Sequence, residues 1–198
     1  MKRTIPVILC LFFLAGCAGQ QTGLSYENPT EQPLTLKKIY LQVNDVRQVK
    51  EILSPRVKEM KIWSGTGSVI NLIQRAAKRK DETSSSEQQH EITQDFMDAM
   101  SLRLNNLGVK VIPLPSDEGP TLTLEIERVQ LDLKKSNFIA EITYLAKVAR
   151  NGKIFHQERV TGRAEKYNLL GKRTGQQVLS EAFSLAINNL DVKAFLSK

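Results

Sequence analysis

The chain has 198 residues, of which 41% are hydrophobic and 25% are charged, and this composition excludes wholesale disorder and a collagen-like repeat. Its two cysteines, Cys10 and Cys17, are too few for a disulfide framework or a zinc cluster. The net charge of +7 suggests acidic partners, and the length fits one domain with a tail.

The first residues have the pattern of a bacterial export signal. Lys2 and Arg3 precede an uncharged apolar run that is shorter than the about 20 residues needed to cross a bilayer, and that has the length of a signal-peptide core. The run ends in Leu14-Ala15-Gly16-Cys17, which resembles the lipobox of bacterial lipoproteins. In a lipobox the chain is cut before the cysteine, and the cysteine is acylated. We therefore expect a signal peptide over residues 1–16 and lipid attachment at Cys17, with an ordinary secretory peptide cut elsewhere as the alternative.

The residues after the cysteine indicate the membrane to which the protein is sorted. Ala18 resembles the outer-membrane pattern, because enteric-type lipoproteins that stay at the inner membrane carry Asp at this position. Two or three acyl chains hold a protein firmly, whereas one is marginal. Residues 17–35 are rich in Gln, Gly, Asn, Pro and Thr, and we expect them to form a lipid-anchored flexible tether. A body without cysteine suits an oxidising periplasm, so the domain is expected to face that compartment.

Residues 36–198 are expected to form one α+β domain. Alternating apolar residues predict a first strand, and its inward face is Ile39, Leu41 and Val43. Ser68 is placed to cap a short helix, and the Ser-rich stretch 81–89 predicts an exposed loop. Residues 50–90 as a whole are interpreted as a basic insertion.

A second helix is predicted from about Ile92 to Leu107, because apolar residues recur at helical spacing there. Gly108 supplies the left-handed residue that often ends a helix. A short strand over residues 109–112 follows, and it stops at Pro113.

An antiparallel region comes next. The alternation that begins at Leu122 changes phase near Glu127-Arg128, which predicts a β-bulge. A long alternating strand over residues 138–148 meets Asn151-Gly152, the strongest short hairpin signal. In that hairpin Val148 is expected to lie opposite Phe155.

The last element is a helix that is predicted to start near Thr174, where Thr174 and Gln177 match a capping box. Its expected buried stripe is Val178, Leu179, Ala182, Phe183, Ala186 and Leu190. The fold class that follows is α+β, an antiparallel or mixed sheet with helices packed on one face and a closing C-terminal helix.

The pattern over residues 95–195 resembles the YajG family of bacterial lipoproteins. The features that carry the resemblance are the lipobox, the helix end over residues 104–111, the meander with an Asn-Gly turn, and the final segment over residues 190–195. Val43-Asn44-Asp45-Val46-Arg47 also looks like the early strand of that family, which is followed by Asp and Arg. The resemblance implies an envelope lipoprotein and a fold, and it implies no activity.

Residues with catalytic potential are few. The two histidines, His90 and His156, lie in no ligand or triad spacing, and the serines lack a glycine-elbow context. Glu125 and Glu127 share one strand face, as in any solvated sheet. We therefore expect no enzyme activity, no metal and no cofactor, and keep a periplasmic enzyme that uses this carboxylate pair as a minor alternative.

The positive charge of the chain is concentrated in one segment. Residues 50–80 carry a net charge of +6. The cations of this candidate patch for an anionic surface are Lys50, Arg56, Lys58, Lys61, Arg75, Lys78, Arg79 and Lys80. The alternative is a solvated insertion whose charges maintain solubility. Nucleic acid is not an expected partner, because the expected compartment holds none.

These observations favour an outer-membrane lipoprotein whose non-catalytic periplasmic domain is a binding or assembly component of the cell envelope. Its expected partners are the membrane, through the lipid anchor, and envelope proteins or an anionic cell-wall or lipid surface. The alternative is an accessory lipoprotein subunit of an envelope transport or secretion complex, docked through a strand edge or the basic segment.

Overall fold

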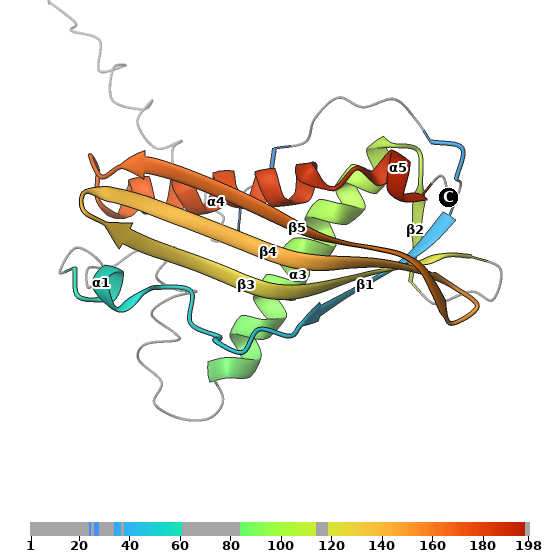
Figure 1. Cartoon of the computed structure of the whole chain (residues 1–198), viewed down its shortest axis with the longest axis horizontal. Helices are drawn as coiled ribbons and strands as arrows, with labels where there is room; N and C mark the ends of the chain where they lie inside the picture. Colours follow the sequence, from blue (N-terminus) through green and yellow to red (C-terminus); the bar gives the residue numbers. More distant parts are fainter. Residues whose placement is uncertain are drawn as a thin grey trace, which may run out of the picture.

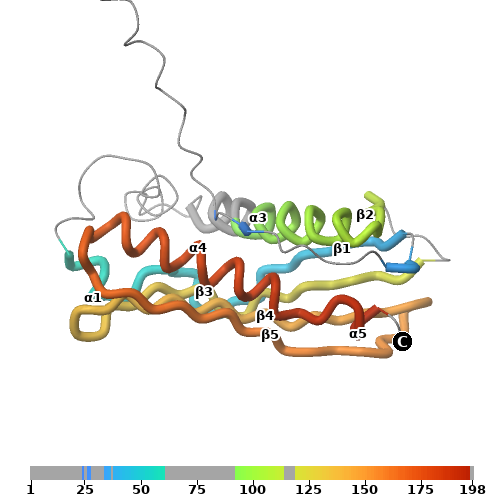
Figure 2. Tube along the Cα trace, turned by 90° about the horizontal axis from the view of Figure 1, so that it is seen from above, coloured from blue at the N-terminus to red at the C-terminus, as the bar shows by residue number. Residues whose placement is uncertain are grey.

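The computed structural model describes residues 24, 26–27, 34–36, 38–60, 84–113 and 119–196. Five strands form one sheet in the order β2-β1-β3-β4-β5, and the long helices lie on one face of it (Figures 1 and 2). The elements in chain order are β1 (Lys38–Asp45), α1 (Pro55–Lys58), α3 (Ser84–Asn106), β2 (Lys110–Ile112), β3 (Thr121–Lys134), β4 (Asn137–Arg150), β5 (Lys153–Tyr167), α4 (Lys172–Asn189) and α5 (Val192–Leu196). The predicted α+β class with helices on one face is confirmed.

The sheet is mixed. β1 pairs in parallel with both β2 and β3, and β3, β4 and β5 form an antiparallel meander. The connection from β1 to β2 passes through α3, because parallel neighbours need a crossover that is usually helical. The register shift of β3 between Ile126 and Arg128 confirms the predicted bulge.

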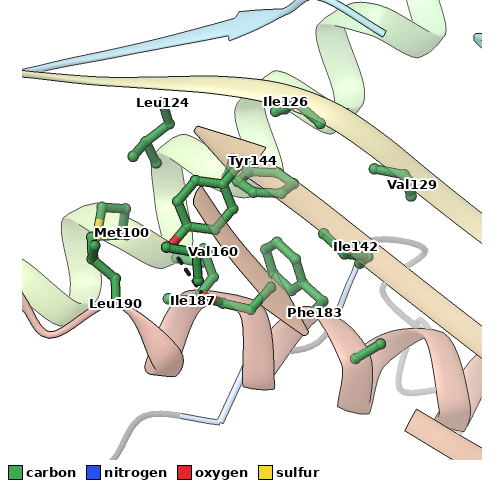
Figure 3. Close-up of a cluster of buried hydrophobic side chains, with 14 of the residues drawn as sticks. Met100, Leu124, Ile126, Val129, Ile142, Tyr144, Val160, Phe183, Ile187 and Leu190 are labelled. Atoms are coloured by element: carbon green, nitrogen blue, oxygen red, sulfur yellow. Dashed lines mark hydrogen bonds between the residues drawn. The ribbon is translucent and has the colours of Figure 1, made fainter. Parts of the chain in front are cut away.

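The core lies between the sheet and the two long helices (Figure 3). α3 packs on β1 and β2, whereas α4 packs on β4 and β5. At the junction the ring of Phe96 makes edge contacts with Tyr144 at 5.7 Å and with Phe183 at 5.0 Å between ring centroids. The predicted buried stripe of the last helix is confirmed at all six positions.

α4 approaches the backbone of β5 very closely. A Cβ atom on Gly162 would lie 2.1 Å from the carbonyl oxygen of Ala182 and 2.2 Å from the amide nitrogen of Ala186. Glycine on the strand and alanines on the helix therefore set the distance between these two elements.

Two helix starts differ from the sequence prediction. α3 begins at Ser84, so the loop predicted over 81–89 is wrong from Ser84 onward; the Glu and Gln residues there favour helix. α4 begins at Lys172 after Gly171, which has φ +55°, and no side chain caps it. The capping box at Thr174 is wrong, because its Oγ1 instead accepts a hydrogen bond from the amide of Leu170 at 3.1 Å.

The hairpin forms at the predicted turn, with φ +52° at Asn151 and +74° at Gly152. Its register is shifted by one residue from the prediction. Val148 lies opposite His156, and Ala149 lies opposite Ile154, so that Phe155 is the extra residue of a bulge. The short helix predicted after Ser68 lies outside the described residues.

Candidate functional site

The segment that follows the predicted anchor is attached to the folded domain. The hydroxyl of Tyr26 donates a hydrogen bond to Oδ1 of Asn188 at 2.9 Å, and Nδ2 of Asn188 donates to the carbonyl oxygen of Glu27 at 3.0 Å. The amide of Glu27 also donates to Oγ of Ser184 at 3.0 Å. We call these contacts between residues 26–27 and α4 the N-terminal latch. The predicted acceptor cysteine, Cys17, itself lies outside the described residues.

Two more contacts extend this attachment. The amide of Leu24 donates to Oδ2 of Asp95 on α3 at 3.3 Å, and the amide of Leu34 donates to the carbonyl oxygen of Leu107. Leu24, Tyr26, Leu34 and Leu36 also pack against the core. Sequence reasoning placed these residues in a tether and missed the attachment; the signal that could have revealed it was the large apolar side chains among polar neighbours.

The latch limits how far the domain can lie from an anchor at Cys17. Cys17 precedes Glu27 by ten residues, which span at most ~35 Å when fully extended. An acylated Cys17 would therefore hold α4 within this distance of the membrane.

Three of the eight predicted patch residues are described, so the patch itself stays a prediction. Lys50 points inward, with Nζ 3.1 Å from the carbonyl oxygen of Asp45. Lys58 pairs with Glu51 at 2.6 Å, whereas Arg56 is exposed. The other five, Lys61, Arg75, Lys78, Arg79 and Lys80, lie outside the described residues.

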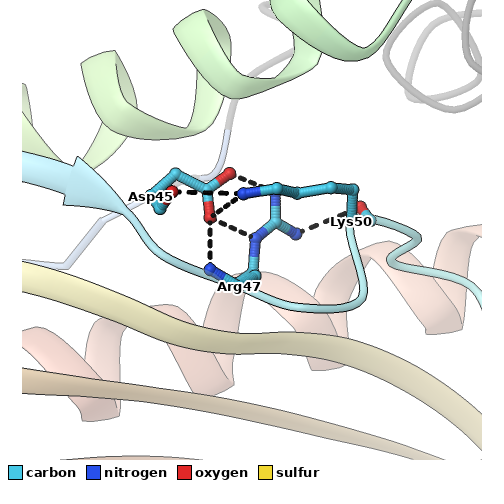
Figure 4. A network of polar contacts seen from close by, with 3 residues as sticks. All are labelled: Asp45, Arg47 and Lys50. Carbon is cyan, nitrogen blue, oxygen red and sulfur yellow. Dashed lines mark hydrogen bonds and ion pairs between the residues drawn. The ribbon is translucent and has the colours of Figure 1, made fainter.

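A buried ion-pair network follows β1 (Figure 4). Arg47 donates to both carboxylate oxygens of Asp45, from Nε at 2.9 Å and from Nη2 at 2.8 Å, and these two side chains are 1% and 2% exposed. Its Nη1 donates to the carbonyl oxygen of Lys50, whose Nζ lies 3.2 Å from the Asp45 carboxylate. All these contacts lie within one six-residue segment, so the network fixes the bend of the chain after β1.

The protonation state of Asp45 agrees with this structural role. Burial would raise the pKa of the Asp45 carboxyl, but the hydrogen bonds and the charge of Arg47, together with Lys50, outweigh burial and hold the pKa below its ordinary value. The carboxylate is therefore a stable anion rather than a proton donor near neutral pH.

The sheet face that the helices leave open carries cross-strand ion pairs. Glu125 accepts from Nζ of Lys147 at 2.6 Å, and Glu127 accepts from both Nε and Nη2 of Arg159 at 2.8 and 2.9 Å. Arg159 holds the pKa of Glu127 below its ordinary value. The two glutamates of the carboxylate-pair hypothesis each pair with their own cation, as is common on a solvated sheet face.

The described part of the chain contains no cluster of three His, Cys, Asp or Glu side chains that could hold a metal ion. The ring of His156 lies 4.5 Å from the ring of Phe195, a packing contact between β5 and α5. His90 lies on α3. Among the helices in the described ranges, none combines the length and the apolar character that crossing a bilayer requires.

Comparisons with known proteins show a shared fold. The chain matches no protein-family model, and no curated protein matches it in sequence. A solved structure of a Xanthomonas campestris protein of the DUF330 family is similar with a TM-score of 0.58 and 12% identity, over 89% of this chain and 94% of that one.

Two bacterial lipoproteins are also among the similar solved structures. The minor lipoprotein of Acinetobacter baumannii has a TM-score of 0.36 and 15% identity, over 80% of this chain and 87% of that one. Rare lipoprotein B of Shewanella oneidensis has a TM-score of 0.36 and 17% identity, over 77% and 89%. The resemblance to the YajG family stays a prediction.

Proposed function

We propose that this chain is a lipoprotein anchored to the outer membrane through acylated Cys17, with a periplasmic domain that binds or assembles other envelope components and carries out no catalysis. The observation that carries the proposal is the order of charge, apolar run, small residues and cysteine over residues 2–17.

The contacts near the N-terminus support this role. A lipid anchor restricts a domain to the membrane surface only as tightly as the chain between them allows. In this chain the contact of the Leu24 amide with Asp95 on α3, together with the latch, limits the connection between anchor and domain to the residues from Cys17 to Leu24. The domain would thus work close to the membrane rather than at the end of a long tether.

The state of the carboxylates and histidine supports a role without catalysis. General acid–base chemistry needs a group whose pKa lies near the working pH. The pKa values of Asp45 and Glu127 are instead held low by arginine partners, and His156 packs against Phe195.

The proposal is tested by blocking lipoprotein signal peptidase with globomycin in cells that produce the full chain. The expected result is an unprocessed precursor that keeps residues 1–16, and the same precursor should accumulate for Cys17→Ser without the drug. Soluble, unacylated protein in untreated cells would contradict the proposal.

A second candidate is an accessory subunit of an envelope transport or secretion complex. The observation that favours it is the edge of the sheet at β5, one of the two edge strands of the described sheet. Ile154 and Phe155 on this edge are 50% and 42% exposed, and a sheet edge can accept a strand from a partner.

This second candidate is tested by placing a photocrosslinking amino acid at Phe155 in cells. It predicts one dominant crosslinked envelope protein that is missing when the same amino acid replaces Leu102, which is 48% exposed on α3. Recovery of abundant lipoproteins alone, equally from both positions, would contradict it.

A further inference from the structure

One end of the molecule exposes large apolar side chains in the loop between β5 and α4. Tyr167, Leu169 and Leu170 are 60%, 78% and 62% exposed. These values place them among the most exposed large apolar residues of the described chain. Clustered exposure of this kind marks a contact surface more often than isolated exposed residues do.

The loop is fixed in place by the neighbouring turn. The amide of Asn168 donates to the carbonyl oxygen of Ser136 in the β3–β4 turn at 2.8 Å, and Tyr167 pairs with Asn137 across the sheet. The β3–β4 turn, the β5–α4 loop and α1 lie together at this end in both views (Figures 1 and 2). We call this end the apolar tip.

The elements that meet at the apolar tip also carry exposed cations. Lys134 and Lys135 are exposed in the β3–β4 turn, and Arg173 is exposed in the first turn of α4. Arg56 on α1 is also exposed, and its charge and that of Lys134 act on the same carboxylate, Asp132. The tip therefore presents exposed apolar side chains from one segment and exposed basic side chains from three others.

Three acidic side chains near the tip, Asp132, Glu165 and Glu181, have partners within the domain, and Glu59 at the end of α1 is exposed. The carboxylate of Asp132 accepts from the amide of Leu133 at 2.8 Å. Glu181 pairs with Lys166 at 2.7 Å. The carboxylate of Glu165 accepts from the side-chain Nδ2 of Asn137 at 2.7 Å and lies 3.8 Å from Arg163. These contacts leave the positive charge of the two turn lysines and Arg173 facing outward.

We propose that the apolar tip inserts Tyr167, Leu169 and Leu170 into the headgroup region of a phospholipid bilayer, with Lys134, Lys135, Arg173 and Arg56 on the phosphates of anionic lipids. Tyrosine and leucine side chains bury apolar surface at such an interface, while basic residues gain from the negative surface potential. An anionic bilayer matches a surface that combines apolar side chains with cations. An uncharged groove on a partner protein would match only the apolar side chains and would leave the cations without counter-charges.

This inference rests on the proposed anchoring at Cys17, and the geometry permits both contacts with one membrane. Ser184, which holds the latch, lies twelve residues along α4 from Lys172 at the tip, which corresponds to ~18 Å of helix. The seven-residue connection from Cys17 to Leu24, whose amide is held by Asp95, spans at most ~25 Å, which is longer than this stretch of helix.

The test uses the full chain as processed in cells, reconstituted into vesicles that carry nitroxide-labelled lipids. A bimane label is attached to Leu169→Cys, and in a matched variant to Leu102→Cys, an exposed leucine near the end of α3 that leads to β2 at the opposite end of the molecule. One set of vesicles contains equal parts phosphatidylcholine and phosphatidylglycerol, and the other contains phosphatidylcholine alone.

The expected result is strong quenching of the label at position 169 in the anionic vesicles, with weak quenching at position 102. Each basic residue near an anionic surface favours association by about fivefold, so Lys134→Glu together with Lys135→Glu should return the quenching at position 169 to the level at position 102. Lys134→Glu and Lys135→Glu both replace exposed side chains, and circular dichroism checks that the doubly substituted protein folds.

Equal quenching at positions 169 and 102, or quenching that the charge reversal leaves unchanged, would overturn the contact of the tip while the vesicles still carry the anchored protein. A protein that does not float with the vesicles, and whose unsubstituted form takes the label at Cys17, would overturn the anchoring and this inference with it.

Discussion

Gly162 is the residue at which the packing of α4 depends on a missing side chain. We predict that Gly162→Ala lowers the free energy of unfolding by about 3 kcal/mol or more, because the added methyl group meets helix backbone at 2.1 and 2.2 Å rather than a movable side chain. The measurement is urea unfolding followed by circular dichroism. Gly152→Ala is the matched control: its φ of +74° costs about 1 kcal/mol, but no atom lies within 4 Å of its new methyl group. Equal losses for the two variants would contradict the account.

Tyr144 and Arg103 bind carbonyl groups in the last turn of α4, which the helix itself leaves without partners. The hydroxyl of Tyr144 donates to the carbonyl oxygen of Ala186 at 3.1 Å, and Nη1 of the buried Arg103 donates to that of Ile187. Tyr144→Phe should therefore cost about 1–3 kcal/mol of unfolding free energy, since a buried carbonyl loses its donor. Tyr167→Phe, at a tyrosine that is 60% exposed, should change the same quantity very little. If Tyr144→Phe left the free energy of unfolding unchanged, water or another group would have to replace the hydroxyl.

Asp45 makes stability depend on pH. Its folded-state pKa is lower than the ordinary value, so the stabilisation that it contributes is complete above about pH 4 and is lost as the pH falls further through the folded-state pKa. Asp45→Asn should lower the unfolding free energy at pH 7 by about 3–5 kcal/mol, because the buried guanidinium of Arg47 loses its counter-charge. Unfolding measured from pH 7 to pH 2 should also show a shallower decline for the variant. Parallel pH profiles for the two proteins would contradict the assignment.

At the residue scale, Asp45 and Arg47 were named in the sequence only as part of the segment that resembles the YajG family, and their pairing was not predicted. The spacing of two residues is compatible with a surface turn as well as with a buried bidentate pair. Only the packing of α3 over the end of β1 decides between them. Gly162 carried no local signal either, since its importance comes from α4, which is distant in the sequence.

At the scale of elements, the latch is the contact whose loss should have a local effect. Asn188→Ala removes the two hydrogen bonds that Asn188 makes to residues 26–27 and leaves the one from the amide of Glu27 to Ser184, so chymotrypsin should cleave after Tyr26 faster while the midpoint of urea unfolding changes little. Asn189→Ala is the control, because it also removes an amide-to-carbonyl hydrogen bond, but one from α4 to Thr161 of β5. Equal cleavage rates after Tyr26 in both variants would show that the latch does not hold this segment.

The elements themselves were largely predictable. Period-two alternation located the strands, and the Asn-Gly signal and the phase slip located a turn and a bulge. The errors arose where the decisive partner is distant or where two local signals compete. Thr174 matches a capping box by sequence but forms its hydrogen bond with Leu170, and the bulge at Phe155 depends on how β5 pairs with β4. The parallel pairing of β1 between β2 and β3 has no local signal at all.

At the scale of the whole molecule, charged and apolar side chains occupy separate regions of the surface. The open sheet face carries paired charges, the helix face carries the latch, and the apolar tip carries leucines, a tyrosine and exposed cations. The sequence predicted a candidate basic surface in residues 50–80, and it stays a prediction because five of its eight cations lie outside the described residues. The tip was missed because its lysines and leucines come from separate segments that only the fold brings together.

The central claim is that a lipid on Cys17 holds this domain at the membrane. It is tested most directly by the intact mass of the full chain purified from the cell envelope. The account predicts a chain that begins at Cys17 and carries the added mass of two or three acyl chains, all of it on the N-terminal peptide. A chain that begins at any other residue, or a Cys17 with a free thiol, would contradict it.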